Sequence, residues 1–272
     1  MFLQVKDERL IPTLIFDIET VPDIAGLRIL HGLNDCVSDA EVAEMAFQQR
    51  RQATGSDFIQ HHLQRVIAIS CALREGERFK IWSLGEAGVD EGGLIQHFFD
   101  LIDRYSPQLV SWNGGAFDLP VLHYRGLIHG VQCARYWEMG EDDRDFKWNN
   151  YISRYHLRHL DLMDLLALYT GRANAPLDDM ARLIGFPGKT GLDGSLVWDA
   201  YRQGKLDEIR NYCETDVVNT YLVYLRFQMM RGHLSREGYK EECELLKKEL
   251  ATLRLPHWDE FLAAWSENSS RV

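Results

Sequence analysis

Apolar and polar residues alternate along several short stretches of the chain, a pattern typical of β-strands. The first strand is predicted over residues 13–19, where four apolar side chains accompany two acids. Residues 65–72 and 78–84 read as two more strands, and the short Glu75-Gly76 link between them favours a hairpin. Two further strands are predicted over residues 108–112 and 156–160.

Between and after these strands the apolar positions recur with the spacing of a helix. Ser38 and Glu41 are spaced as a capping box, which predicts a helix start at that point. Further helices are predicted over residues 91–105, 118–128, 162–169, 177–184 and 207–230, followed by charged helices that end near Trp265. Prolines and glycines predict a loop-rich region over residues 171–194.

This order of elements predicts an α/β fold with a mixed five-stranded sheet flanked by helices. The first three strands have short links and are expected to be antiparallel, whereas the later strands need helical crossovers and are expected to be parallel to the first. The chain shows no internal repeat and no clear linker. We therefore predict one domain over residues 1–232 and a helical extension, residues 233–272, packed on the same domain.

Composition limits the class of protein. The 272 residues carry 30 basic and 41 acidic side chains, a net charge of −11, and 46% of them are hydrophobic, which is typical of a globular chain. The acidic balance argues against a simple nucleic-acid coat protein. The charged first nine residues are unlike a signal peptide, and no apolar run approaches the roughly 18 residues of a membrane span. Five widely spaced cysteines predict neither a zinc ribbon nor a disulfide framework. We expect a cytoplasmic protein with no membrane partner.

Asp17 and Glu19 are two residues apart on the first predicted strand, so both carboxylates point from the same face. Their apolar neighbours indicate a central strand that is buried on both sides. Two acids in such a place repel each other unless a cation neutralises them. The alternative is a pair at the solvent-exposed end of the strand, just before Pro22, and the pair alone does not decide between the two.

Two other patterns are weak by themselves. Asn113 and Phe117-Asp118 follow the end of a predicted strand and begin a helix, where an Asp is a common structural choice. Tyr212 and Asp216 are four residues apart and share one face of a late helix, a frequent surface arrangement.

Together and in this order, the three patterns resemble the motifs of the DnaQ-like (DEDD) 3′–5′ exonucleases, and the tyrosine places the chain with the DEDDy branch. Phe16 to Pro22, Trp112 to Pro120, Pro187 to Lys189 and Tyr212 to Asp216 are similar to the predicted 3′–5′ exonucleases related to the proofreading domain of family-B DNA polymerases. The resemblance covers residues 14–232. It implies a ribonuclease H-like fold and, since no polymerase module is visible, a stand-alone enzyme.

The resemblance also implies roles for individual residues. Hydrolysis of a phosphodiester by this class uses two divalent ions, and oxygen ligands suit Mg²⁺ or Mn²⁺. Asp17 would bridge both ions, Glu19 and Asp216 would hold the ion that activates water, Asp118 would hold the other, and Tyr212 would orient the water. Thr20, Asn113, Phe117 and Lys189 would contact the substrate, although Phe117 could instead be a core residue and Lys189 an ordinary loop lysine.

The expected reaction is therefore the removal of nucleoside 5′-monophosphates from the free 3′ end of single-stranded DNA. The alternatives are RNA as the substrate, because the 2′-hydroxyl decides that choice locally, and a non-catalytic module that binds nucleic acid or protein. A second acidic group is less convincing. A metal cluster at His156, His159, Asp161 and Asp164 is conceivable, but a structural role is the favoured interpretation.

Overall fold

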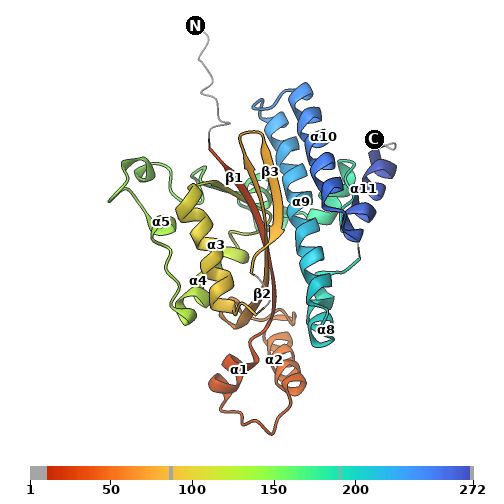
Figure 1. Ribbon diagram of the computed structural model, residues 1–272. Coiled ribbons are helices and arrows are strands. Elements are labelled where there is room, and N and C mark those ends of the chain that lie inside the picture. Colours follow the sequence, from red (N-terminus) through yellow and green to blue (C-terminus); the bar gives the residue numbers. More distant parts are fainter. Residues whose placement is uncertain (1–10, 86–87, 190, 270–272) are drawn as a thin grey trace.

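The computed structural model describes residues 11–85, 88–189 and 191–269 (Figure 1). The charged first nine residues therefore lie outside the described part of the chain. The strands are β1 (Thr13–Pro22), β2 (Gln64–Glu75), β3 (Arg78–Ser83), β4 (Gln108–Ser111) and β5 (His159–Asp161). The α-helices are α1 (Ile24–His31), α2 (Asp39–Thr54), α3 (Glu91–Tyr105), α4 (Asp118–His129), α5 (Ala134–Trp137), α6 (Leu162–Leu166), α7 (Leu177–Leu183), α8 (Val197–Arg202), α9 (Leu206–Met230), α10 (Arg236–Leu253) and α11 (Pro256–Ser269). Short 3-10 turns are η2 (His61–Leu63), η3 (Arg144–Lys147), η4 (Gly171–Ala173) and η5 (Gly194–Leu196).

The five strands form one mixed sheet in the order β3-β2-β1-β4-β5. β1 and β2 are antiparallel, as are β2 and β3, whereas β4 and β5 run parallel to β1. The predicted α/β fold, with three antiparallel strands followed by two parallel ones, is confirmed.

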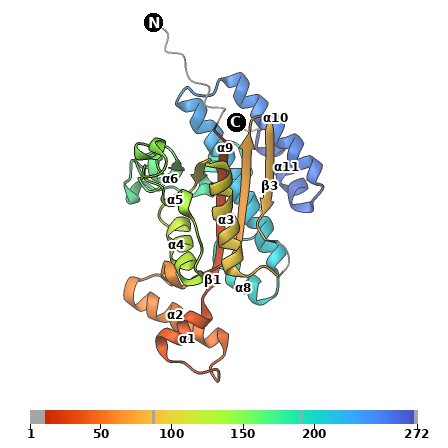
Figure 2. The same ribbon diagram turned by 60° about the vertical axis from the view of Figure 1, so that its left-hand side comes forward.

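Helices cover both faces of the sheet (Figures 1 and 2). One face packs against α3 and α4, and the opposite face packs against α9 and the C-terminal helices. Leu14, Phe16 and Ile18 belong to the core on the α3 side, while Ile15 belongs to the core on the α9 side. Because side chains alternate along a strand, the acids at positions 17 and 19 point toward α9.

The carboxyl half of β1 has an open edge. β4 pairs with β1 only from Thr13 to Ile15, although β1 continues to Pro22. Beyond Ile15, that edge of β1 is covered by the turn after β4 and the first residue of α4. The backbone groups there are not used by β4, and the nitrogen of Ile18 donates instead to the side chain of Asp118. This is where the candidate site forms.

A helical hairpin made of α1 and α2 extends beyond the carboxyl end of β1 (Figures 1 and 2). Asp23 caps α1 by accepting a hydrogen bond from the backbone nitrogen of Gly26, and the predicted capping box of Ser38 and Glu41 begins α2. The hairpin has its own small core, which includes Leu27, Val42, Ala46, Ile59 and Leu63. The sequence pattern does not predict α1, because its eight residues span barely two turns and include a glycine.

Several predicted boundaries are wrong by three residues. The first two strands continue to Pro22 and Glu75, past their predicted ends at residues 19 and 72, because their pairing runs on from Thr13 with Arg74 to Pro22 with Gln64.

The fifth strand begins at His159 rather than at residue 156, because Asn149 holds the preceding backbone in a loop: its side chain accepts from the nitrogen of Leu157, and its carbonyl accepts from Arg158. The helix predicted over residues 162–169 ends at Leu166, since Leu168 and Tyr169 adopt positive φ angles of 51° and 60° that a right-handed helix excludes.

The C-terminal helices pack on the sheet and on α9. Glu242 of α10 accepts hydrogen bonds from Arg74 of β2 at 2.9 and 2.6 Å, and from the hydroxyl of Tyr221 of α9. Glu214 of α9 accepts a hydrogen bond from Ser83 of β3 and lies 3.3 Å from His257 of α11. The division between residues 1–232 and 233–272 stays a prediction.

α9 is the longest described helix, with 25 residues, but its first half carries several charged side chains. No helix in the described ranges combines the length and the apolar character that crossing a membrane requires.

Candidate active site

The two acids of β1 meet the first third of α9. The carboxylates of Asp17 and Glu19 and the sulfur of Cys213 offer ligand atoms that all lie within 4.8 Å of one another. Cys213 is fully buried and donates to Asp17, with its sulfur 3.4 Å from the carbonyl oxygen and 3.5 Å from Oδ2. The prediction of two acids on one face of a central strand agrees with this arrangement, in which Glu19 is only 9% exposed.

Asp118 reaches the same place from α4. It is the first residue of that helix and is 3% exposed. Its Oδ1 atom accepts a hydrogen bond from the backbone nitrogen of Ile18, 3.2 Å away, at the open edge of β1. The third acid is therefore fixed against the strand residue that lies between the first two.

Asp216 and Tyr212 come from one face of α9. Asp216 is 7% exposed, and its Oδ1 atom is buried without a hydrogen-bond partner among the described residues. A buried carboxylate oxygen that lacks a partner is costly, so it points to a partner that binds there. Four carboxylates from β1, α4 and α9 thus gather at one end of the sheet.

Lys189 brings a positive charge to this group. Its Nζ atom donates to the hydroxyl oxygen of Tyr212 at 2.6 Å and lies 4.0 Å from Oδ2 of Asp216. Its backbone nitrogen donates to Asp178, and the adjacent Gly188 exchanges two hydrogen bonds with the side chain of Asn219. The loop is anchored on both α7 and α9, and Lys189 faces the acids.

Burial and mutual repulsion shift the titration of these groups. Burial raises the pKa of Asp17 well above its ordinary value, and the charges of Asp118, Glu19 and Asp216 raise it further. Burial raises the pKa of Asp118 to about 7. Burial also raises the pKa of Asp216, but only to about 6, because the charge of Lys189 acts in the opposite direction. All of these shifts mean that the site binds protons until cations replace them.

The donor set fits hard divalent cations. Carboxylate oxygens are the ligands that Mg²⁺ and Mn²⁺ prefer, and Asp216, with its unpartnered oxygen, is close enough to Glu19 for its charge to raise the pKa of that acid. Cys213 was not among the predicted site residues. Its spacing of three residues before Asp216 on a helix is the signal that could have indicated it.

The four residues predicted to contact the substrate lie in different local environments. Thr20 donates its hydroxyl to Gln64 at 2.9 Å. Asn113 has a φ angle of 68° and forms the turn after β4, where its carbonyl accepts from Phe117. The ring of Phe117 is partly exposed immediately before Asp118, and Lys189 faces the acids as described. Their contacts with a substrate stay predictions.

The second acidic group, around Asp161, makes contacts that stabilise the fold. Asp161 accepts hydrogen bonds from the backbone nitrogens of Asn113, Gly115 and Asp164, so it holds the turn that precedes Asp118 and also caps α6. His159 lies 2.8 Å from the hydroxyl of Ser111, and burial lowers its pKa to about 4. These contacts agree with the favoured interpretation of this group.

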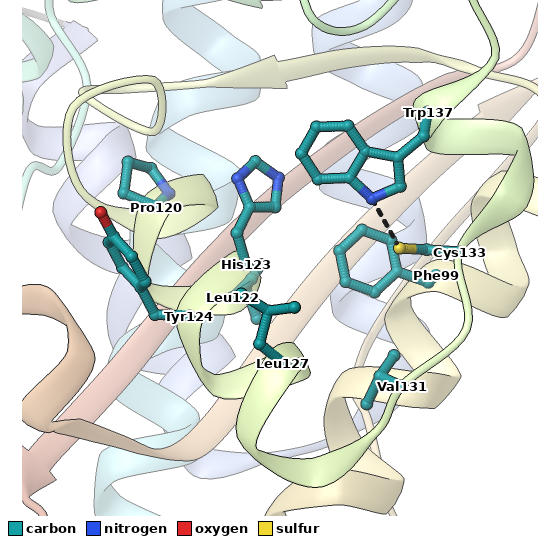
Figure 3. Close-up of a pocket in the computed structure, with 10 residues that line it drawn as sticks. Phe99, Pro120, Leu122, His123, Tyr124, Leu127, Val131, Cys133 and Trp137 are labelled. Carbon is teal, nitrogen blue, oxygen red and sulfur yellow. Dashed lines mark hydrogen bonds between the residues drawn. The ribbon is translucent and has the colours of Figure 1, made fainter.

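A separate apolar cavity of about 560 Å³ lies along α4, between that helix, α3 and α5 (Figure 3). His123 and Trp137 face it, and the indole nitrogen of Trp137 donates to the sulfur of Cys133. None of the four carboxylates lines this cavity. The carboxylates of the candidate site therefore lie outside this cavity.

Comparison with known proteins agrees with the site. Residues 56–265 match the family described as a predicted 3′–5′ exonuclease related to the exonuclease domain of PolB, and the chain belongs to this family. It is also similar to a DNA polymerase of Archaeoglobus fulgidus, with 25% identity over 150 aligned residues. The aligned segment covers 54% of this chain and 19% of the polymerase. The chain thus spans about a fifth of that relative.

These findings confirm the resemblance and the ribonuclease H-like fold. Asp118, Tyr212 and Asp216 lie inside the matched residues, whereas Asp17 and Glu19 precede them. The inclusion of Asp17 and Glu19 in the site therefore rests on their position beside α9 and on the motif that they form.

Proposed function

We propose that the protein is a metal-dependent 3′–5′ exonuclease that hydrolyses the last phosphodiester bond of single-stranded DNA and releases nucleoside 5′-monophosphates. The observation that carries this proposal is the convergence of Asp17, Glu19, Asp118 and Asp216, with one buried Asp216 oxygen unpartnered among the described residues. Such a group is unfavourable in a folded protein unless it serves to hold cations.

Asp17, Glu19, Asp118 and Asp216 would hold two Mg²⁺ or Mn²⁺ ions. When bound, such ions lower the pKa of an attacking water and stabilise the charge that develops on the leaving 3′ oxygen. The four acids come from three separate elements, so the folded sheet and helices fix their relative positions before any substrate arrives.

Tyr212 would orient the attacking water. Its hydroxyl oxygen accepts from Lys189, and its proton is directed at Asp216, whose pKa this hydrogen bond lowers, so the hydroxyl lies between the cation and a proposed metal ligand. Burial and the charge of Asp216 raise the pKa of Tyr212 above its ordinary value, which keeps the hydroxyl protonated. Lys189, fixed by its loop, would neutralise a phosphate oxygen beside it.

The proposal is tested with 5′-labelled single-stranded DNA and RNA oligonucleotides, incubated with Mg²⁺, Mn²⁺ or EDTA. We expect a ladder of products that shortens from the 3′ end, requires the metal and is absent for Asp17→Ala. Asp207→Asn, an exposed acid on the same helix as Asp216, serves as the control and should cleave like the wild type. Faster cleavage of the RNA would reverse the choice of substrate, and no cleavage of either polymer would contradict the proposal.

A further inference from the structure

Asp17, Ser70 and Ser83 lie side by side on three neighbouring strands. Ser70 of β2 is the register partner of Asp17 on β1, and Ser83 of β3 is the register partner of Ser70. Residues that stand opposite each other in a sheet share one face, so both serines point toward α9, as Asp17 does. The hydroxyl oxygens of the two serines are 3.0 Å apart. A short polar row thus crosses the sheet beneath α9 and ends at the first acid of the proposed metal site.

Two consecutive residues of α9 contact this row. Ser83 donates to Glu214 at 2.8 Å. Cys213 is hydrogen-bonded both to Ser70 and to Asp17. Cys213 and Ser70 are each 0% exposed, so water does not reach them. Their polar atoms therefore depend on the row itself for hydrogen-bond partners.

The thiol of Cys213 contacts Asp17 at two atoms. Its sulfur lies 3.4 Å from the backbone carbonyl oxygen of Asp17 and 3.5 Å from Oδ2 of the same residue. Rotation about the Cα–Cβ bond of Asp17 would carry Oδ2 away from the sulfur while the carbonyl oxygen stayed in place. The contact with Oδ2 therefore restrains the carboxylate in one rotamer. A thiol does this without the positive charge with which a lysine would oppose cation binding.

We propose that Cys213 is a positioning residue: it holds the carboxylate of Asp17 in the orientation that binds divalent cations, and Ser70 in turn holds Cys213. This inference rests on the proposed function and names a residue on which cation binding at that site depends. A group that hydrogen-bonds to a metal ligand orients that ligand, and its loss lowers metal affinity by about 10- to 100-fold. Cys213 therefore acts on the cations through Asp17.

Calorimetric titration of the metal-free protein with Mn²⁺ tests this role without requiring cleavage. We expect Cys213→Ala to bind Mn²⁺ at least about 10-fold more weakly than wild type. Cys213→Ser should bind it nearly as well as wild type, because a hydroxyl group can donate in place of the thiol. Wild-type affinity in Cys213→Ala, or an equal loss in the two variants, would overturn the positioning role.

Cys71→Ala is the matched control. Cys71 is also 0% exposed, but it belongs to the core on the α3 side of the sheet. Its replacement should lower stability, because it leaves a small cavity, and should leave the Mn²⁺ affinity unchanged. A fall in affinity equal to that of Cys213→Ala would show that any buried cavity disturbs the site, and would contradict the proposal.

Ser70→Ala tests the row while it leaves the acids and the thiol in place. It should weaken Mn²⁺ binding by itself but add nothing to the loss in Cys213→Ala, because the two side chains act in series. Unchanged affinity in folded Ser70→Ala, or losses that add, would overturn the link between Ser70 and Cys213. This variant also supplies the test if Cys213→Ala does not fold.

The outcomes separate this inference from the exonuclease itself. Wild-type Mn²⁺ binding and cleavage in Cys213→Ala would remove the positioning role and leave the exonuclease standing. Mn²⁺ binding that Cys213→Ala weakens, in a protein that cleaves neither DNA nor RNA, would instead contradict the exonuclease and leave the positioning role standing.

Discussion

Asp118 accepts a hydrogen bond from the backbone nitrogen of Ile18, a residue 100 positions earlier in the chain. This contact exists because β4 stops pairing with β1 after Ile15 and leaves that nitrogen without a strand partner. One carboxylate thus has two tasks: its Oδ1 atom completes the edge of the sheet, and its charge contributes to the proposed metal site.

The two tasks of Asp118 can be separated by substitution. Asp118→Asn can keep the oxygen that accepts from Ile18 but removes the charge, so we expect a folded protein whose cleavage rate falls at least about 100-fold. Asp118→Ala removes both and should also be less stable by about 1–3 kcal/mol, because a buried backbone donor loses its acceptor. Cleavage assays and urea unfolding measure the two effects, and near-normal cleavage by Asp118→Asn would exclude Asp118 as a ligand.

The stability of the metal-free protein should depend on pH in a defined direction. The folded-state pKa values of Asp118 and Asp216, about 7 and about 6, exceed the value near 4 expected in the unfolded chain. A carboxyl group with a raised folded pKa contributes stability that is complete below its unfolded pKa and is lost as pH rises through its folded pKa.

We therefore expect Asp118→Asn to gain stability relative to wild type as the pH rises, when both proteins are free of metal. The difference between their melting temperatures, variant minus wild type, should increase by about 3 to 6 °C between pH 5 and pH 8. Saturating Mg²⁺ should abolish this increase, since the cations neutralise the acids that repel each other in the wild type. A melting-temperature difference that is independent of pH would show that Asp118 is already ionised without metal.

Tyr212→Phe isolates the hydroxyl group. The ring, over which the Lys189 ammonium lies at 5.1 Å, is retained, so the fold and the carboxylates should be unaffected. We expect kcat to fall about 10- to 100-fold, because the donor that orients the attacking water is lost. Calorimetric titration with Mn²⁺ should give unchanged affinity, and an unchanged kcat would remove Tyr212 from the mechanism.

Arg125 joins the α1–α2 hairpin to the rest of the protein. It is 3% exposed and contacts Glu91 through two nitrogens and Asp23 through a third. Arg125→Met should lower the free energy of unfolding by about 3–5 kcal/mol, because it leaves two acids without their cation in a buried place.

Urea denaturation measures the loss, with Arg202→Met as the control. Arg202 is half exposed and pairs with Asp199 at the surface, so its replacement should change the free energy of unfolding by about 1 kcal/mol or less. Equal losses for the two variants would show that burial adds nothing to the Arg125 cluster.

The sequence predicts the sheet well because each strand has its own alternating pattern and its own link to the next. It fails where the backbone follows side-chain contacts instead of periodicity. Asn149 prevents the fifth strand from starting early, and the positive φ angles of Leu168 and Tyr169 end α6 before the predicted residue.

The sequence indicates which residues form the candidate site, but it does not indicate which other side chains contact them in the fold. Four acids and a tyrosine stand in recognisable motifs, and the alternation along β1 placed two of the acids on one face. The contact between Lys189 and Tyr212 depends on a loop whose path is fixed by Asp178 and Asn219, and no local pattern records that path.

Glu214 occupies the same turn of α9 as Asp216, and it is held by Ser83 of β3 and by His257 of α11. The helix that supplies two of the proposed site residues therefore rests on the last helix of the chain. A variant that ends at residue 232 would leave Glu214 without its imidazole partner and α9 without its cover. We expect such a variant to lose its cleavage activity even though every site residue remains, since residues 233–272 hold α9 in place against the sheet.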